Sequence, residues 1–223
     1  GITTGTGYTS LTVTGNRILN NGPTNVVNTS AITLVGINAT GTGAAITETI
    51  QSNIIDGLYI KGLGVPAVLQ NIIGIQTAAG TSATVTSRNI YSNYIANLFS
   101  TSGVSSLITG IRSSGAAAST TNIYKNLITR IYPGQSGVAG ASGIAINANS
   151  GNTNIYNNMV NLDLTTAPLP AANGILTGAD ALRAINLTST ATINLYYNTI
   201  RLAGSGTGAS FGTEGILRVG AGT

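Results

Sequence analysis

The apolar residues of the chain recur in short groups in which they alternate with polar residues. The clearest group reads Asn-Ile-Tyr-x-Asn-x-Ile at residues 89–95, and versions of it return at 122–128, 154–160 and 194–200. Two looser versions, at 12–18 and 49–55, precede it. Because a period of two places alternate side chains on opposite faces, the pattern predicts β-strands rather than helices.

The groups belong to a longer repeat of uneven length. The second asparagine of the group falls at 16, 53, 93, 126, 158 and 198, at intervals of 37, 40, 33, 32 and 40 residues. A Gly-Ile pair precedes each group, at 1–2, 36–37, 74–75, 110–111 and 143–144, while Ala184-Ile185 takes its place in the sixth copy and Gly215-Ile216 opens a partial seventh. We therefore predict repeats starting near 1, 36, 74, 110, 143 and 184, with a last one from 215.

Each repeat contains three short apolar segments, namely Gly-Ile, Ile-Tyr-x-Asn and Ile-x-x-Leu. Within each segment we expect apolar and polar residues to alternate strictly. Three short strands for each turn of the chain predict an all-β fold, a right-handed parallel β-helix in one block over residues 1–223. The uneven repeat length predicts a variable loop after the third strand, longest from about Asp163 to Arg183 and including Gly174-Ile175. A second excursion, from Thr77 to Ser87, is expected at the first bend of the third coil.

Stacked coils predict ladders of equivalent side chains along the axis. Three inward aliphatic ladders are expected: Val13, Ile50, Ile90, Ile123, Ile155 and Leu195; Ile18, Ile55, Ile95, Ile128, Val160 and Ile200; and Ile2, Ile37, Ile75, Ile111, Ile144 and Ile185. A structural asparagine ladder is expected at the bend between the second and third strands: Asn16, Asn53, Asn93, Asn126, Asn158 and Asn198. Such amides bond the backbone at the bend and the amide of the next coil.

Charge and composition remove many functions. Only 6% of residues are charged, the net charge is +4, and the chain has no His and no Cys. We therefore expect no catalytic residue of the triad type, no thiolate or histidine metal site and no cofactor. The nine basic residues are scattered, which argues against nucleic acid as a partner. No apolar run reaches the ~18 residues of a membrane-spanning helix.

The five acids, Glu48, Asp56, Asp163, Asp180 and Glu214, lie in different repeats and at different repeat positions. Asp163 and Asp180 could meet across the long loop, with Arg183 paired to Asp180, but solvated loop carboxylates are the plainer interpretation. Neither a Ca²⁺ site nor a catalytic carboxylate pair is expected from this spacing.

With its Gly-Ile strands, inward isoleucine ladders and Asn-x-Ile bends, the whole chain resembles the right-handed β-helix family that includes pectate lyases, tailspikes and repetitive bacterial surface proteins. The Asn-Ile-Tyr-x-Asn unit is most similar to large secreted surface proteins and adhesins. The resemblance implies the fold; for a pectate-lyase-like enzyme it would also imply clustered aspartates and an Arg or Lys base on one outer face.

The outer face of the second strand is the candidate ligand or partner face. Tyr91, Tyr124, Tyr156 and Tyr196 share one repeat position, and Asn89, Asn122, Asn154 and Asn194 lie two residues earlier on the same face. Three interpretations stay open: self-stacking with a structural role, a protein interface, and glycan binding in which rings stack on sugars and amides bond hydroxyls. Threonine arrays of the ice-binding kind are not repeated in register.

These observations favour a non-enzymatic, extracellular, cell-surface segment with a structural or adhesive role, such as a stalk, fibre or adhesin. The alternative is a polysaccharide-binding or polysaccharide-processing β-helix. The chain opens and closes at the start of a repeat without a capping helix. We therefore expect uncapped ends that stack on further coils or on another copy.

Overall fold

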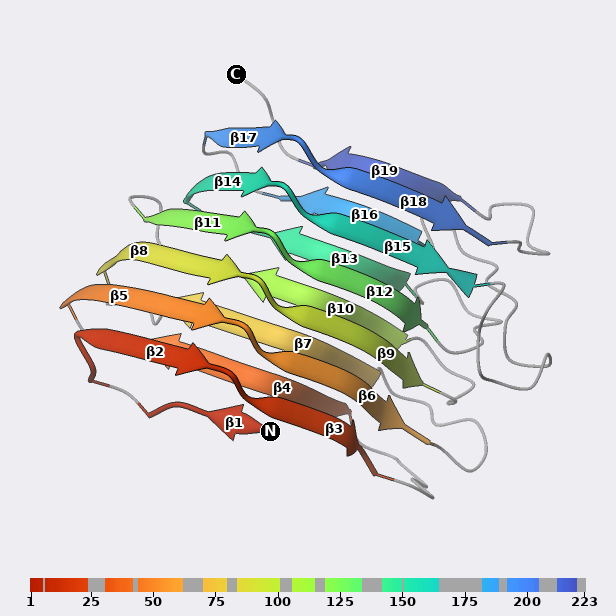
Figure 1. Cartoon of the computed structure of the whole chain (residues 1–223), viewed down its shortest axis with the longest axis horizontal. Coiled ribbons are helices and arrows are strands. Elements are labelled where there is room, and N and C mark those ends of the chain that lie inside the picture. Colours follow the sequence, from red (N-terminus) through yellow and green to blue (C-terminus); the bar gives the residue numbers. More distant parts are fainter. Residues whose placement is uncertain are drawn as a thin grey trace.

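The computed structural model describes residues 1–5, 7–23, 31–41, 44–61, 70–79, 84–100, 106–114, 119–133, 142–149, 151–164, 182–188, 192–204 and 212–219. Within these ranges the chain is almost entirely β-strand, wound into three parallel sheets (Figure 1). The all-β parallel solenoid predicted from the repeat is confirmed, with six coils of three strands followed by the first strand of a seventh.

The three sheets are built from every third strand in the chain. The first sheet contains β1 (Ile2–Thr3), β4 (Ile32–Gly41), β7 (Gln70–Ala79), β10 (Ser106–Ser113), β13 (Ser142–Ala148), β16 (Leu182–Leu187) and β19 (Thr213–Arg218). The second contains β2 (Ser10–Thr14), β5 (Ala44–Gln51), β8 (Thr84–Tyr91), β11 (Thr120–Tyr124), β14 (Asn152–Tyr156) and β17 (Ile193–Tyr196). The third contains β3 (Arg17–Asn21), β6 (Ile54–Ile60), β9 (Tyr94–Ser100), β12 (Leu127–Tyr132), β15 (Met159–Asp163) and β18 (Thr199–Ala203).

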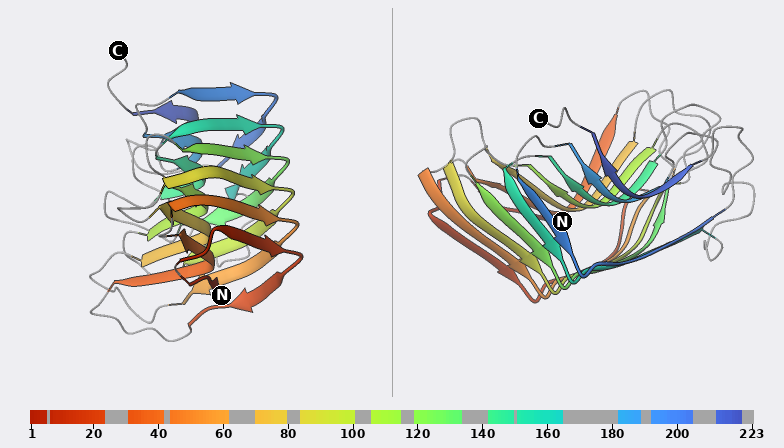
Figure 2. Two further views of the ribbon diagram at one scale, coloured as in Figure 1. Left: turned by 90° about the vertical axis from the view of Figure 1, so that its left-hand side faces the viewer. Right: turned by 90° about the horizontal axis from the view of Figure 1, so that it is seen from above.

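Seen from the side and from above, the coils lie one over another and the sheets enclose a common interior (Figure 2). The ladder that includes Ile123 pairs in register through the second sheet, and the ladder that includes Ile128 does so through the third, as predicted. Most of these aliphatics are fully buried and belong to one continuous core. Each coil thus completes its core only against its neighbours, which is why stacking rather than an isolated coil makes folding favourable.

The ladder of the first sheet corrects one predicted residue. Ile111 pairs with Ile146, whereas Ile144 pairs with Thr109, so Ile146 is the fifth rung and the Gly143-Ile144 pair lies two residues too early. Ala145 therefore takes the small-residue position before the rung, as Ala184 does in the next coil. At Gly110 a Cβ would lie 2.6 Å from the Ala145 carbonyl oxygen, so that coil requires glycine, whereas the next two coils carry alanine.

A second correction concerns the third strand, where strict alternation fails in the first four coils. Their strands carry a residue with positive φ at one repeat position: Asn20 (φ 47°), Gly57 (φ 80°), Asn97 (φ 53°) and Arg130 (φ 54°). This left-handed residue shifts the inward phase in all four strands together, so Ile95 and Leu98 are both buried three residues apart while the strands stay paired one residue to one. In the fifth coil Val160 and Leu162 are two apart in a regular strand.

The excursion expected between Thr77 and Ser87 is shorter than predicted, because β7 extends to Ala79 and β8 begins at Thr84. Gly174-Ile175 and most of the loop from Asp163 to Arg183 lie outside the described residues.

Candidate functional site

The bend between the second and third sheets is built from two residues in every coil. The first has a left-handed backbone: Gly15, Ser52, Ser92, Lys125, Asn157 and Tyr197 have φ values from 53° to 68°. The second is the ladder asparagine. Because the left-handed residue turns the chain sharply, the asparagine side chain that follows it enters the interior, where Asn53, Asn93, Asn126 and Asn158 are each 1% exposed.

The predicted asparagine ladder forms a continuous set of hydrogen bonds along the axis. Asn126 donates from its backbone N (3.1 Å) and from Nδ2 (3.0 Å) to Oδ1 of Asn158 in the next coil. Its Nδ2 also donates to the Ile90 carbonyl oxygen of the preceding coil (2.9 Å). The same contacts recur from Asn16 to Asn198. We call this set the inner ladder; it satisfies backbone groups at the bend that would otherwise be buried without a partner.

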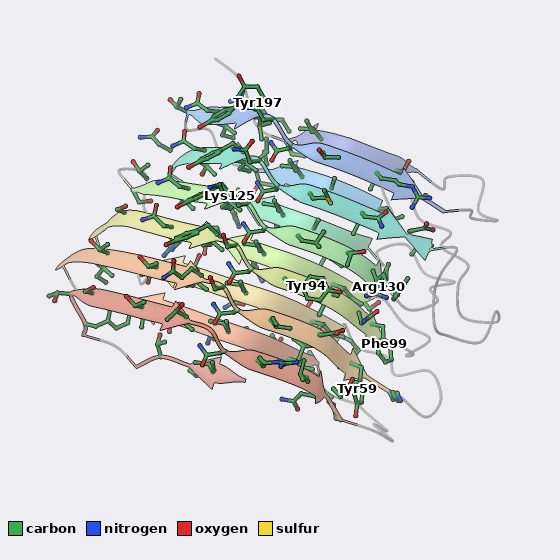
Figure 3. All side chains as sticks on the ribbon, viewed as in Figure 1. Tyr59, Tyr94, Phe99, Lys125, Arg130 and Tyr197 are labelled. Carbon is green, nitrogen blue, oxygen red and sulfur yellow. The ribbon has the colours of Figure 1, made fainter. Side chains whose placement is uncertain are left out.

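The tyrosines on the outer face of the second sheet form a stacked column. Their ring centroids are 4.7–4.8 Å apart from Tyr91 to Tyr196, and the ring planes differ by 3° to 8°. Tyr197, which is 82% exposed, meets Tyr196 edge-on at the upper end of the column (Figure 3). Each inner ring therefore has both faces against other rings, and only its edge and hydroxyl are presented outward.

Burial raises the pKa of Tyr124 and Tyr156, and the neighbouring tyrosines raise it further.

The asparagines two residues earlier form a second amide column, which we call the outer ladder. Asn122 donates to Asn89 Oδ1 (3.0 Å), Asn154 to Asn122 Oδ1 (2.8 Å) and Asn194 to Asn154 Oδ1 (2.8 Å). The structure thus brings together all eight residues of the candidate face. The observed stacking favours the structural and interface interpretations over sugar stacking, because a sugar needs a free ring face.

A polar cluster inside the second sheet was missed by the sequence analysis. Glu48 on β5 and Arg88 on β8 are paired in register and form an ion pair whose side chains are 0% exposed. Tyr8 donates to the other Glu48 oxygen (2.7 Å), and Arg88 donates to the Ser114 carbonyl oxygen (3.0 Å). Burial, and next the hydrogen bond to Glu48, raise the pKa of Tyr8 to about 12. A signal was present, since Glu48 and Arg88 each lie two residues before an inward isoleucine.

The outer face of the third sheet carries a smaller aromatic and basic patch. Tyr59 and Phe99 stack with centroids 5.4 Å apart, and Lys61 Nζ lies 4.8 Å from the Tyr59 centroid. Arg130 donates to the Tyr94 hydroxyl (3.0 Å). Figure 3 labels Tyr59, Tyr94, Phe99 and Arg130, which lie over β6, β9 and β12. Neither contact was predicted, because the left-handed residue changes which residues of the third strand face outward.

The acids have partners rather than an open setting. Arg201 Nη1 donates to Asp163 Oδ2 (2.6 Å), and Asn97 Nδ2 donates to Asp56 Oδ1 (2.6 Å). Arg183 Nε lies 3.3 Å from Glu214 Oε2. Asp163 is 6% exposed at the end of β15, so it is not the solvated loop carboxylate predicted. Asp180, the expected partner of Asp163 and Arg183, lies outside the described residues.

Within the described ranges no three acidic residues gather as metal ligands would. In the part of the chain that the structure describes, no helix is long and apolar enough to cross a membrane. No protein-family model matches the sequence, and no curated protein or solved structure matches it.

Proposed function

We propose that this solenoid is a non-enzymatic structural segment, a stiff stalk or fibre element with a structural or adhesive role on the outside of a cell. The observation that carries the proposal is the continuity of its ladders. The same asparagine bond, aliphatic contact and parallel register repeat from coil to coil, so a load along the axis is shared by backbone and side-chain hydrogen bonds at every interface.

The setting of the ionisable groups supports this function over an enzymatic one. Each acid in the described ranges contacts a basic residue or an amide. A general acid or base must be within reach of a substrate and hold a suitable pKa. Glu48, the most buried carboxylate, is closed off by Arg88 and Tyr8.

The test combines two measurements on the purified chain. Single-molecule pulling along the axis is expected to show unfolding coil by coil at a nearly uniform force, because adjacent interfaces are alike. Incubation with a panel of neutral and acidic polysaccharides, with and without Ca²⁺, is expected to release no new chain ends. Turnover of any of them would overturn the proposal.

Glycan binding without turnover is the second candidate, and the patch on the third sheet favours it. Its half-buried rings and the two cations, Lys61 and Arg130, suit an acidic sugar chain. A glycan array comparing the natural chain with Tyr59→Ala tests this: specific binding lost in the variant supports it, and no binding contradicts it.

A further inference from the structure

The outer face of the second sheet differs in charge from the rest of the chain. Its outward positions hold hydroxyl, amide and tyrosine side chains and no charged residue, although the chain has fourteen charged residues in all (nine basic and five acidic). The two charges of β5 and β8, on Glu48 and Arg88, point into the core instead. Two copies of this net-positive chain could therefore approach through this face without placing like charges opposite each other.

The face is also ordered before any partner arrives. Its asparagines are joined by the outer ladder, and its tyrosines are fixed by stacking at 4.7–4.8 Å. Within the described ranges none of the four hydroxyls of the tyrosine column has a hydrogen-bond partner. Contact with a second surface would thus cost little side-chain entropy and would give these hydroxyls partners.

The side chains of the two columns project to different distances from the sheet. Long tyrosine side chains lie in one column and short asparagine side chains in the next, two residues away along each strand from β8 to β17. A twofold axis parallel to the solenoid would set the tyrosine column of one copy against the asparagine column of the other. Long side chains opposite short ones fill the space of about 10 Å between packed sheets.

The alternative twofold axis, parallel to the strands, gives a poorer fit. It would set tyrosines against tyrosines and asparagines against asparagines, which crowds one column and leaves a gap at the other. The covered ring faces disfavour a sugar as the occupant. We propose that two copies of this chain pair side by side, with parallel axes, through the tyrosine and outer asparagine columns of the second sheet.

The size of the face sets the expected strength. The two columns span four strands, and four strands at about 4.8 Å and five residues at about 3.3 Å give roughly 320 Å² for each copy, or about 630 Å² in total. That area is below the range of stable dimers, so pairing at micromolar or weaker affinity is expected. In a longer array of such coils the same contact would be repeated along the axis. The inference rests on the structural role proposed above and identifies a second copy of the chain as the partner in that role.

Sedimentation velocity over a concentration series tests the pairing. The natural chain is expected to form a dimer increasingly as concentration rises. Asn122→Arg with Asn154→Arg adds charge to the face while leaving the ring column in place, and should weaken the dimer at least about tenfold. The matched control is Met159→Arg with Thr199→Arg, which adds the same charge in one column of the third sheet. Circular dichroism verifies that both variants fold.

Introduced thiols test the arrangement, because the chain has no cysteine. Under air oxidation, a mixture of Tyr124→Cys and Asn122→Cys should form the mixed disulfide faster than either variant pairs with itself. Faster pairing of Tyr124→Cys with itself would overturn the parallel arrangement. A folded natural chain that stays monomeric throughout would overturn the pairing but not the stalk, which only polysaccharide turnover would overturn.

Discussion

Two asparagine ladders lie only four residues apart in each coil, one on the second strand and one at the bend that follows it, yet they are built differently. The inner ladder is buried, and each amide bonds both the next amide and the backbone of neighbouring coils. The outer ladder is half-buried to exposed, and its amides are joined only to each other in the bonds described. The two ladders therefore share residue type and spacing. They differ in the unfolding free energy lost when one amide is removed, because only removal of an inner amide leaves buried backbone groups without a hydrogen-bond partner.

Removing one inner amide is the largest expected effect. Asn126→Ala leaves the Ile90 carbonyl oxygen and the Asn93 backbone N–H without their partners, at ~1–3 kcal/mol each, so we expect a loss of roughly 4 kcal/mol in unfolding free energy. Asn122→Ala, the matched change in the outer ladder, should cost less than about 1 kcal/mol. Urea denaturation measures both, and equal losses would contradict the distinction between the ladders.

The buried ion pair extends the comparison to charge. Glu48→Gln leaves the Arg88 charge buried without a carboxylate, so a loss of about 3 kcal/mol is expected. Adding Arg88→Met should recover much of it, since the double variant buries no charge. Urea denaturation of the single and double variants gives the two values. A double variant less stable than the single one would show that the pair is needed for more than charge balance.

Alkaline pH should lower the stability of the fold through Tyr8 more than through the tyrosines of the outer column. The pKa of Tyr8 is raised to about 12, whereas an unfolded tyrosine titrates near 10. The folded state therefore holds the proton more tightly, and its stability should fall as pH rises from about 10 towards 12. Tyr8 is partly exposed, so the effect is modest. Thermal unfolding at several pH values measures it, and Tyr8→Phe should flatten the fall; an unchanged slope would exclude Tyr8 as its source.

The smallest expected effect lies at the bend that directs the inner ladder inward. Lys125 is exposed and has φ of 55°, a conformation that glycine adopts without cost, as Gly15 does in the first coil. Lys125→Gly should therefore stabilise the chain by about 0.5 kcal/mol after the added freedom of the unfolded state is counted. Asn157→Gly should gain less, because asparagine tolerates this backbone better. Thermal unfolding compares the two, and destabilisation by Lys125→Gly would contradict the account.

The fold and both ladders could be predicted because each coil repeats the residues that face its neighbours. Asn126 and Asn122 recur in type and spacing, and periodicity alone aligns them with their equivalents. The left-handed backbone at Arg130 could not be predicted from the repeat, since Asn, Gly and Arg all occupy its position and share only a backbone angle. Ile144 was misassigned because residues 143–146 offer two apolar matches, and only strand pairing decides between them. Glu48 and Arg88 were missed because charged side chains were assigned to the surface without regard to the inward phase.

The inner amides are held by the backbone of neighbouring coils as well as by each other, whereas the outer amides bond only each other. Hydrogen exchange of the side-chain Nδ2 groups, followed by NMR, tests this difference most directly. The account predicts that Asn53, Asn93, Asn126 and Asn158 exchange at least about 100-fold more slowly than Asn89, Asn122, Asn154 and Asn194. Equal exchange rates in the two sets would contradict it.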